Sequence, residues 1–254
     1  MIAKAPAVSV VMPAYNCEKY IEAAIRSVIS QTFTDWELIV IDDGSSDSTR
    51  EIIDRLAAED SRILSLPNEK NMGVAATRNR GIDISRGSYI ALLDSDDVWR
   101  ENKLTRQMEL AESSDSDLVY CSYGIIDEDG NNLCSDFIVR EVADYESTLT
   151  RTEISCSTAL LSRKLVENFR FSTEFYHEDL VLWLEILRAG YTARGVDETL
   201  ADYRVSKGSR ASNKLKSAFE RYKVFRVQMR EPFFRSVGLI IKYAFLALKK
   251  YKRI

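Results

Sequence analysis

Three carboxylates within four residues follow an apolar stretch in the first half of the chain. The stretch Tyr89–Leu93 reads YIALL, and Asp94, Asp96 and Asp97 come directly after it. An apolar run of this length is typical of a buried strand, and open α/β sheets bind ligands outside the carboxyl ends of their strands. Clustered carboxylate oxygens there suit Mg²⁺ or Mn²⁺, which proteins hold together with substrate phosphates. The cluster favours a metal–phosphate site, although an acidic surface turn can have the same composition.

A second acidic strand end lies about fifty residues earlier. The apolar segment Trp36–Ile41 (WELIVI) is followed by Asp42, Asp43 and Gly44, and then by the possible helix caps within Ser46–Ser48. Helix capping would account for the later residues but not for the leading pair of aspartates. Because adjacent parallel strands end at the same edge of a sheet, we expect the two acidic ends to face one crevice.

A glycine turn and a basic helix follow in the segment Asn71–Gly81 (NMGVAATRNRG). Gly73 would form the turn, and Arg78 would be the counter-charge of a phosphate or nucleotide. The alternative is a purely structural helix whose alanines permit close packing on the sheet. This segment alone does not decide between the two.

Two further acids, Glu178 and Asp179, precede the predicted helix Leu180–Arg188. Acids at a helix start commonly serve as caps or as partners of the helix dipole. Here the aromatic residues within Phe171–Tyr176 could partly shield the carboxylates from water, which would favour a role as general base. The residues alone leave both interpretations open.

Strand and helix patterns alternate through the first half of the chain. Short apolar runs predict strands, and apolar residues at helical spacing predict the helices between them. This alternation with short loops is typical of a mainly parallel α/β sheet. After Gly124 the pattern weakens, and Asp127–Asn131 (DEDGN) predicts a hairpin turn with antiparallel strands beside it. The predicted strands are Val8–Pro13, Trp36–Ile41, Ile63–Leu66, Tyr89–Leu93 and Asp117–Ser122, and the predicted helices are Tyr20–Ser30, Ser48–Asp60, Gly73–Ser85, Lys103–Ser113 and Leu180–Arg188.

The length and the cysteines limit the class of protein. A chain of 254 residues can form one large domain with a sizeable core, or a core with an extension. The four cysteines are scattered without a CxxC pair, and His177 is the single histidine, which argues against a zinc site. These features, and a start that lacks a signal-peptide pattern, predict a reduced, cytosolic protein.

The charge is distributed unevenly along the chain. From Tyr203 onward there are 15 Lys/Arg and two acids, a net charge of +13, whereas the remainder carries −17. A basic tail on an acidic body predicts an anionic partner, which could be a membrane surface, a nucleic acid or the body itself. The tail's apolar face lacks interleaved base-stacking aromatics, so we expect no nucleic acid.

The last part of this tail has the pattern of an amphipathic helix. Phe233–Leu248 is largely apolar, but Arg235, Lys242 and Lys249 recur every seven residues. The uncharged runs are far shorter than the about 20 residues that span a bilayer. Heptad spacing places the charges on one stripe, which predicts a helix lying on an anionic membrane surface. The alternative is a helix packed on the body with lysines extending from its edge.

Taken together, the motifs resemble family 2 glycosyltransferases, which have the GT-A fold. The resemblance extends from Val8 to about Asn213 and is specific as a combination. It implies a catalytic domain over residues 1–213, with a mainly parallel central sheet and helices on both faces, followed by a helical tail over residues 214–254. The subgroup it resembles builds bacterial O-antigen, capsule or teichuronic-type polysaccharides. The motifs are VSVVMPAYN, QTFTDWELIVIDDGSSDST, NMGVAATRNRGI, YIALLDSDDVW and the HED before LVLWL.

The resemblance implies roles at a nucleotide end of the site. Pro13 and Tyr15 would line the nucleobase pocket, and Asp43 would accept a hydrogen bond from the uracil N3–H. Asp94 and Asp96 correspond to the family's DxD motif. Asp94 would face the ribose or the metal, and Asp96 would bind the Mn²⁺ or Mg²⁺ that bridges the two phosphates.

The resemblance also implies a catalytic base and further contacts. Asp179 would deprotonate the acceptor hydroxyl while the anomeric carbon inverts. Arg78 and Arg204 would lie near the nucleotide or its diphosphate. Further candidates are Asp42, Asp97, which could be only a cap of the turn into Trp99, and Glu178, the next candidate for the base.

The chain departs from the family pattern after Arg204. Many relatives carry a histidine in this segment that completes the metal site, whereas this chain has Ser206 and Lys207. The departure puts metal retention after donor binding in doubt. Lys207 would supply positive charge to the phosphates instead.

The resemblance and the tail together predict an inverting, metal-dependent transferase. It would move a sugar from a UDP-sugar to a hydroxyl of a polyprenyl-diphosphate-linked saccharide. It would act in the cytoplasm, as a peripheral protein on the inner face of the cytoplasmic membrane.

Two other classes of function compete with this prediction. A haloacid-dehalogenase-type phosphatase would use Asp94, within Leu93–Val98, as a covalent nucleophile, but that motif normally opens its domain and here two strand–helix units precede it. A catalytically inactive nucleotide-sugar-binding module would share the fold. The intact acids argue against it; these are Asp43, Asp94, Asp96 and Asp179.

Overall fold

The computed structural model describes residues 4–151, 153–205 and 214–251 of the chain. Up to Leu92 it alternates strands and helices as predicted, with element ends within two residues of the expected ones, whereas the strand predicted at Asp117–Ser122 continues to Ile126. The strands are β1 (Val8–Ala14), β2 (Trp36–Asp42), β3 (Ile63–Pro67) and β4 (Tyr89–Leu92), and the intervening helices are α1 (Ile21–Ile29), α2 (Thr49–Glu59) and α3 (Val74–Ile84).

Among the described residues, nine strands form one sheet in the order β3-β2-β1-β4-β8-β6-β9-β5, and β7 pairs with β9. The first four strands are parallel, and so are β6 and β9. The short β8 runs antiparallel to both β4 and β6 and joins the two parallel parts. Strands β5 and β7 add to β9 in antiparallel fashion. The remaining strands are β5 (Val98–Trp99), β6 (Leu118–Ile126), β7 (Val142–Ala143), β8 (Leu160–Ser162) and β9 (Ala193–Arg204).

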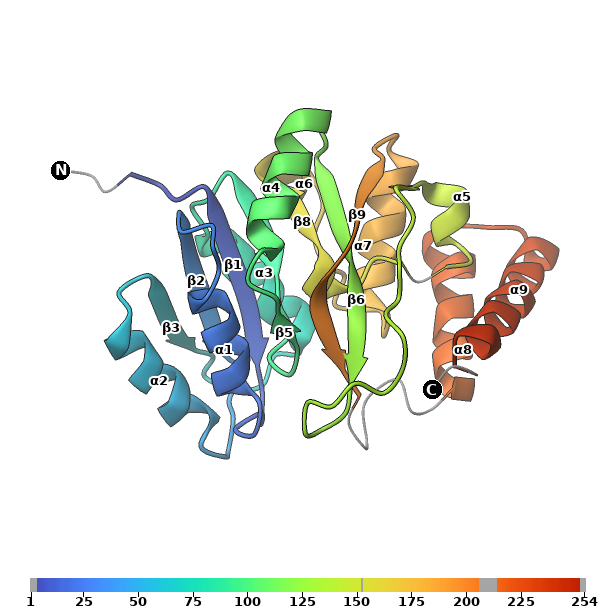
Figure 1. The fold of residues 1–254 in the computed structure, drawn as a ribbon. Coiled ribbons are helices and arrows are strands. Elements are labelled where there is room, and N and C mark those ends of the chain that lie inside the picture. The colour runs from blue at the N-terminus through green and yellow to red at the C-terminus, as the bar shows by residue number, and fades with distance from the viewer. Residues whose placement is uncertain (1–3, 152, 206–213, 252–254) are drawn as a thin grey trace.

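Helices cover both faces of the sheet, as Figure 1 shows. One face carries α1, α2 and α4 (Lys103–Ser114), and the other carries α3, α6 (Arg163–Asn168) and α7 (Glu178–Arg188). In β1 successive side chains alternate between the two cores: Val10 and Met12 pack with the first group of helices and Val11 with the second. Burial on both faces is the reason that the strand reads as a continuous apolar run.

The C-terminal part packs beside α7 at one side of the molecule (Figure 1). It consists of α8 (Lys214–Lys223), a π-helical turn (Val224–Gln228) and α9 (Phe233–Tyr251). Val224 and Phe225 share a third apolar cluster with Leu180 and Leu184 of α7. The structure therefore shows the tail packed on the body, and in the described residues no helix is long and apolar enough to cross a membrane.

Sequence reasoning missed the long strand β9. Its sequence, ARGVDETLADYR, mixes buried and partly exposed positions without strict alternation, because β9 changes register with β6 at two irregularities. The helix α7 begins at Glu178 rather than Leu180, which places both acids in its first turn. The predicted cap at Gly190 is confirmed by its φ of +96° and by its N–H, which donates to the carbonyl of Leu187.

Candidate active site

A cavity of about 790 Å³ lies at the carboxyl ends of β1, β2 and β4. One end is lined by the residues that follow these strands. The opposite end is lined by the start of α7 and by side chains of α8 and α9. The structure thus brings together most of the predicted site residues, namely Pro13, Tyr15, Asp43, Arg78, Asp94, Asp96, Glu178 and Asp179.

The carboxylate of Asp43 is held by three hydrogen bonds. Its Oδ1 accepts from Asn68 Nδ2 at 2.6 Å and from the backbone N–H of Met72 at 2.8 Å, and its Oδ2 accepts from the N–H of Gly73 at 2.9 Å. Gly73 has a φ of +85°, a conformation that a residue with a side chain rarely adopts. A carboxylate has about four acceptor sites, so one remains for a donor in the cavity.

The rest of the acidic segment after β2 fixes the wall around Asp43. Ser45 Oγ accepts the N–H of Asn16, which follows β1, at 3.0 Å. Asp47 Oδ1 accepts the N–H of Thr49, the first residue of α2, at 3.0 Å, whereas the N-cap residue Ser48 makes no side-chain capping hydrogen bond. Asp42 does not line the cavity; its Oδ1 accepts the N–H of Ser45 at 3.2 Å and supports the turn from behind.

Arg78 connects the two ends of the cavity. Its Nη2 donates to Asp94 Oδ1 at 2.6 Å, and its Nη1 donates to Glu178 Oε1 at 2.9 Å. The guanidinium is buried and lies over the ring of Phe171, 5.1 Å from the centroid. Because a buried cation is costly unless it is paired, these two carboxylates are what permits Arg78 to lie there.

The neighbours Asp96 and Asp97 face in different directions. Asp96 lines the cavity, where burial and the nearby Asp94 raise its pKa to about 6. Asp97 is buried in the protein, and its Oδ1 accepts the N–H of Arg204 at 2.8 Å. Burial, Asp96 and Asp94 also raise the pKa of Asp97. Of this pair, only Asp96 is placed to contact a ligand. Asp97 was predicted as a possible cap of the turn into Trp99, and in the structure it also binds the backbone of Arg204.

The 3-10 helix Cys156–Thr158 supports the acidic turn, which sequence reasoning did not foresee. Ser157 Oγ donates to Asp97 Oδ2 at 2.5 Å and accepts the N–H of Asp94 at 3.1 Å. The carbonyl of Ser157 accepts from Trp99 Nε1 at 2.7 Å. One serine thus positions both ends of the turn between Asp94 and Asp97.

Asp179 lies at the other end of the cavity, in the first turn of α7. Its Oδ1 accepts the N–H of Leu180 at 2.7 Å, which orients the carboxylate. The preceding His177 places Nε2 3.0 Å from the carbonyl oxygen of Ser217 in α8, so Nε2 carries the proton of this hydrogen bond. Burial lowers the pKa of His177, and the charge of Asp179 partly offsets this effect.

Arg204, which the resemblance puts near the nucleotide or its diphosphate, lies against the backbone of Asp96. It is buried outside the cavity lining, where its Nε donates to the carbonyl of Asp96 and its Nη1 to that of Asp127, both at 2.8 Å. Its guanidinium also lies 4.7 Å from the ring centroid of Tyr20. Arg204 therefore supports the backbone of the acidic turn. Lys207 lies outside the described residues.

The cavity wall includes side chains from the tail that no motif indicated. Ser217 and Arg221 of α8 and Tyr243 of α9 line the end beside Asp179, as does Arg151. An amphipathic helical pattern shows which face of a helix is apolar, but not which surface of the body it covers. The sequence therefore held no signal for these contacts.

The carboxylates at the strand ends fit a divalent cation that is completed by phosphate ligands. In the described part of the chain, no group of three or more His, Cys, Asp or Glu could hold a metal by itself. Asp94 and Asp96 both line the cavity. No hydrogen bond from another described residue reaches the carboxylate of Asp96, since Arg204 donates to its backbone carbonyl. Hard oxygen ligands in this small number suit Mg²⁺ or Mn²⁺ bound together with substrate phosphates.

The comparison with protein families shows which family the chain belongs to. Residues 9–169 match the model of glycosyl transferase family 2. The chain belongs to this family. It is 35% identical over 245 residues to the glycosyltransferase TuaG of Bacillus subtilis (strain 168), covering 96% of this chain and 97% of TuaG. It is 37% identical over 246 residues to WfgD of Escherichia coli, named as a UDP-Glc:α-D-GlcNAc-diphosphoundecaprenol β-1,3-glucosyltransferase, covering 96% and 94%.

Solved structures show that this family 2 glycosyltransferase has the GT-A fold. TarS 1–349 of S. aureus, in complex with UDP-GlcNAc, aligns with a TM-score of 0.74 at 19% identity, covering 93% of this chain and 71% of TarS. The mannosyltransferase PcManGT from Pyrobaculum calidifontis, in complex with GDP-Man and Mn²⁺, aligns with a TM-score of 0.71 at 18% identity, covering 96% and 70%. Membership of the family favours a glycosyltransferase over the phosphatase that the Asp94 segment also resembled.

Proposed function

We propose that this glycosyltransferase is metal-dependent and inverting, and that it moves a sugar from a UDP-sugar to a hydroxyl of a lipid-diphosphate-linked saccharide. The observation that carries the proposal is the placement of two acids in one cavity. Asp96 follows a strand at one end, and Asp179 starts a helix at the other. This arrangement separates the group that handles the leaving group from the group that activates the nucleophile.

The donor would lie at the strand ends. Pro13 and Tyr15 would contact the base, and Asp43 would accept the N3–H of uracil at the acceptor site that its three hydrogen bonds leave unused. The named donors of related proteins support a UDP-sugar: UDP-Glc for WfgD and UDP-GlcNAc for the TarS complex. Arg78 would orient Asp94 toward the ribose or the metal through their ion pair.

The leaving group is a nucleoside diphosphate, so negative charge increases on its phosphate oxygens during the reaction. Asp96, with Asp94 beside it, would hold the divalent cation there, and the Mn²⁺ in the PcManGT complex supports such a site. When bound, the cation acts as a Lewis acid on the diphosphate. Lys207 would add positive charge, and its place in the site is a prediction from the sequence alone.

The acceptor hydroxyl would lose its proton to Asp179. The helix start and the N–H of Leu180 keep its carboxylate oriented, while Glu178 is engaged with Arg78. A single base opposite the leaving group leads to inversion in one displacement. General-base catalysis contributes about 10²–10⁴-fold to the rate, which is roughly 3–5 kcal/mol of barrier.

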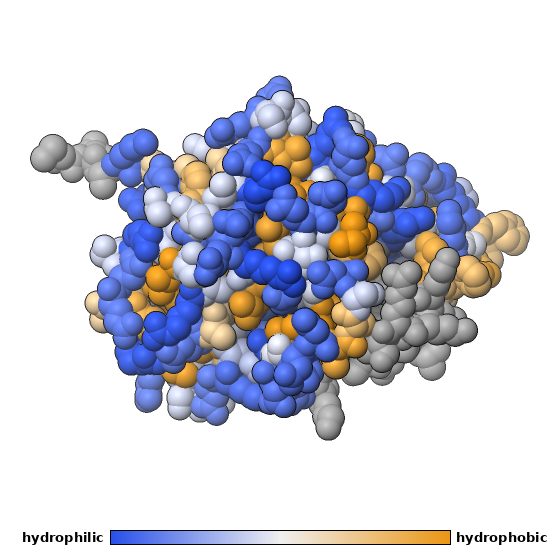
Figure 2. Space-filling model, viewed as in Figure 1, coloured by the Kyte–Doolittle hydropathy of each residue, from blue (hydrophilic) through white to orange (hydrophobic). Residues whose placement is uncertain are grey.

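The acceptor and the tail point to an anionic membrane surface. The diphosphoundecaprenol acceptor in the name of WfgD supports a lipid-linked acceptor for this chain as well. The helix α9 packs on the body through one face and leaves Phe234, Ile241 and Phe245 exposed on another. Figure 2 shows apolar side chains over the beginning of α9, at the right-hand edge of the molecule. We place the enzyme peripherally on the cytoplasmic face of a bacterial membrane.

An assay of UDP release tests this function. The purified protein is incubated with Mn²⁺, a panel of UDP-sugars and GlcNAc linked through an α-diphosphate to a lipid. We expect UDP release that depends on the acceptor and a product of inverted anomeric configuration. Release of phosphate from phosphomonoesters without UDP release, or a product with retained configuration, would contradict the proposal.

A further inference from the structure

Arg221 is a buried cation in the wall of the cavity. Its side chain is 1% exposed, and among the described residues it forms no ion pair with a carboxylate. Its Nη2 donates to the carbonyl oxygen of Thr148 at 3.4 Å, which is long for a hydrogen bond, and its buried Nε has no partner in the described part of the chain. The ring of Tyr243 lies 4.1 Å from the guanidinium carbon.

The guanidinium of Arg221 therefore has no carboxylate in ion-pair contact among the described residues. Burial lowers the pKa of Arg221, while the hydrogen bond between its side chain and that of Tyr243 and the charge of Asp179 act in the opposite direction. The side chain still stays protonated, because arginine does not lose its proton in proteins. A charge that is removed from water without a counter-ion is costly. Arg78, which is also buried, has two carboxylates for this purpose, so the contrast with Arg221 is specific.

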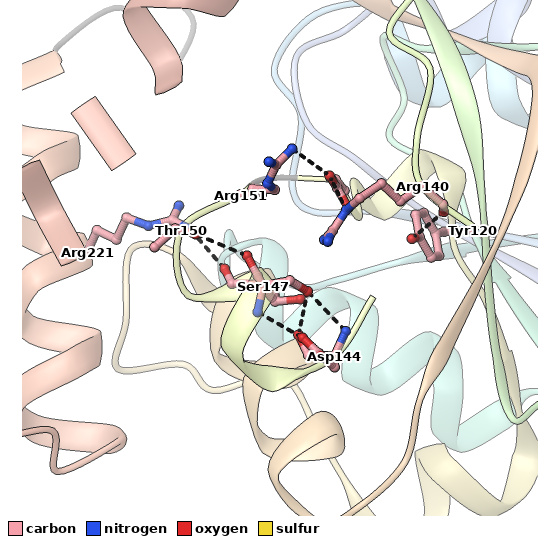
Figure 3. A network of polar contacts seen from close by, with 9 residues as sticks. Tyr120, Arg140, Asp144, Ser147, Thr150, Arg151 and Arg221 are labelled. Atoms are coloured by element: carbon pink, nitrogen blue, oxygen red, sulfur yellow. Dashed lines mark hydrogen bonds and ion pairs between the residues drawn. The ribbon is translucent and has the colours of Figure 1, made fainter. Parts of the chain in front are cut away.

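The position of Arg221 indicates which anion it would bind. Arg221 and Asp179 line the same end of the cavity, away from Asp96. Figure 3 shows Arg221 reaching from α8 toward the turn that carries Thr150, with Arg151 on the same segment. Arg151 also lines this end and pairs with Glu153 at 3.6 Å. Arg221, whose pKa responds to the charge of Asp179, thus lies near the proposed base, and Arg151 lines the same cavity.

We propose that Arg221, assisted by Arg151, binds the diphosphate of the acceptor. This inference rests on the proposed function, because it concerns the substrate whose hydroxyl reaches Asp179. A sugar joined directly to a diphosphate brings that diphosphate to the same end of the cavity as its reacting hydroxyl. A guanidinium suits the task, since its planar donors match two phosphate oxygens at once. The site would thereby select lipid-diphosphate acceptors over neutral glycosides.

Two acceptors with the same sugar test the inference. One carries an α-linked alkyl diphosphate and the other a neutral α-linked alkyl group, and the ratio of their kcat/KM values measures the preference for the diphosphate. We expect the wild-type enzyme to prefer the diphosphate strongly and Arg221→Met to reduce the ratio by about 30-fold or more. Arg221→Lys keeps a charge without the planar donors and should fall between the two.

Arg188→Met is the matched control. Arg188 also joins the tail to the body, because its Nη1 donates to the carbonyl of Met229 at 2.9 Å, but it does not line the cavity. This variant should keep the wild-type ratio. If Arg188→Met lowered the ratio as much as Arg221→Met, the effect would be one of tail packing and the inference would be wrong. A rise in the KM for the UDP-sugar alone would assign Arg221 to the donor and would also overturn it.

A binding measurement separates this inference from the proposed function. The melting temperature of the wild-type protein is measured with an alkyl diphosphate and without any nucleotide. We expect a stabilising shift that is reduced in Arg221→Met, even if no UDP-sugar proves to be a donor. A wild-type protein that neither prefers the diphosphate acceptor nor responds to the alkyl diphosphate would overturn the inference, whether or not the variants fold.

Discussion

Glu178 and Asp179 are adjacent in the chain, yet their carboxylates have different partners. Glu178 Oε1 lies 2.9 Å from Nη1 of the buried Arg78, whereas Asp179 Oδ1 accepts the N–H of Leu180 at 2.7 Å. Both line the cavity. The guanidinium of Arg78 engages the carboxylate of Glu178 and holds it in place. The difference supports Asp179 as the base and Glu178 as a structural partner of Arg78.

Replacing Asp179 with asparagine should remove activity without unfolding the protein. Asparagine has nearly the same shape but cannot accept the proton of the acceptor hydroxyl. We expect kcat to fall by about 10²–10⁴-fold, with the KM for the donor little changed. The measurement is steady-state UDP release together with a melting curve. If the variant turned over at the wild-type rate, the base would have to be assigned elsewhere, with Glu178 as the next candidate.

Replacing Glu178 with glutamine should instead reduce stability. Arg78 would keep Asp94 but lose its second carboxylate, which leaves part of a buried charge uncompensated. We expect the free energy of unfolding to fall by about 1–3 kcal/mol, as measured by urea denaturation. Asp179→Asn serves as the control in the same helical turn. Equal stability of the two variants would argue against this division of roles.

Asp96→Asn should uncouple nucleotide binding from the metal. In the wild-type protein we expect Mn²⁺ to increase the affinity for UDP, measured by calorimetry with and without the ion. The variant should lose this increase, since an amide is a poorer ligand of a hard cation than a carboxylate. Asp42→Asn is the control, because Asp42 lies outside the cavity lining. A metal effect that persists in Asp96→Asn would disprove the assignment.

The lowered pKa of His177 predicts that the protein loses stability as the pH falls. Its pKa in the folded protein lies below the usual value of 6.5, because burial disfavours the charged ring. The unfolded chain therefore binds more protons between these two values, and the contribution of His177 is present above about pH 6.5 and lost as the pH falls. We expect His177→Gln to lose less stability than the wild type between pH 7 and pH 5.

The same residue permits a direct measurement. His177 is the single histidine of the chain, so its ring protons give one unambiguous NMR titration. A measured pKa at or above 6.5 in the folded protein would contradict the prediction. We expect the titration to give a pKa below 6.5 and the denaturation curves to show stability falling toward acid pH.

The exposed face of α9 should contribute to membrane binding. Phe234, Ile241 and Phe245 are 87%, 65% and 69% exposed. Changing them to serine should weaken co-sedimentation with anionic vesicles by about tenfold or more, given the transfer free energy of such side chains. Ile138→Ser is the control, because Ile138 is 59% exposed and lies outside α9. Unchanged sedimentation would mean that the charges of the tail alone attract the protein to the vesicles.

The parallel half of the sheet and its acidic ends could be predicted because their signals are local. Strands β1, β2 and β4 are nearly fully buried, so each reads as an apolar run that ends where its polar residues begin. The predicted turn at Asp127–Asn131 is confirmed, since Asp127 Oδ1 accepts the N–H groups of Asp129 and Asn131. Local chemistry and burial point to the same structure in these segments.

The missed features depend on contacts between distant segments. Ser157 and Asp97 are 60 residues apart, and a lone serine in an irregular segment gives no sign of such a partner. The placement of Arg204 behind the acidic turn, rather than in the cavity, follows from how β9 pairs with β6. Arg221 is one of several basic residues in α8, and the sequence pattern does not distinguish it from the others. Burial distinguishes it, and burial is a property of the assembled fold.

Most residues that line the cavity fall in two stretches of the chain, with Tyr123 and Ile125 between them. The end beside Asp96 is formed largely within residues 13–96, and the end beside Asp179 largely within residues 148–243. On the proposed assignment of donor and acceptor, a crossover between the genes of two such enzymes, placed between these stretches, would exchange the acceptor preference and keep the donor. Such a hybrid would have to preserve Arg78, whose two carboxylate partners would then come from different parents.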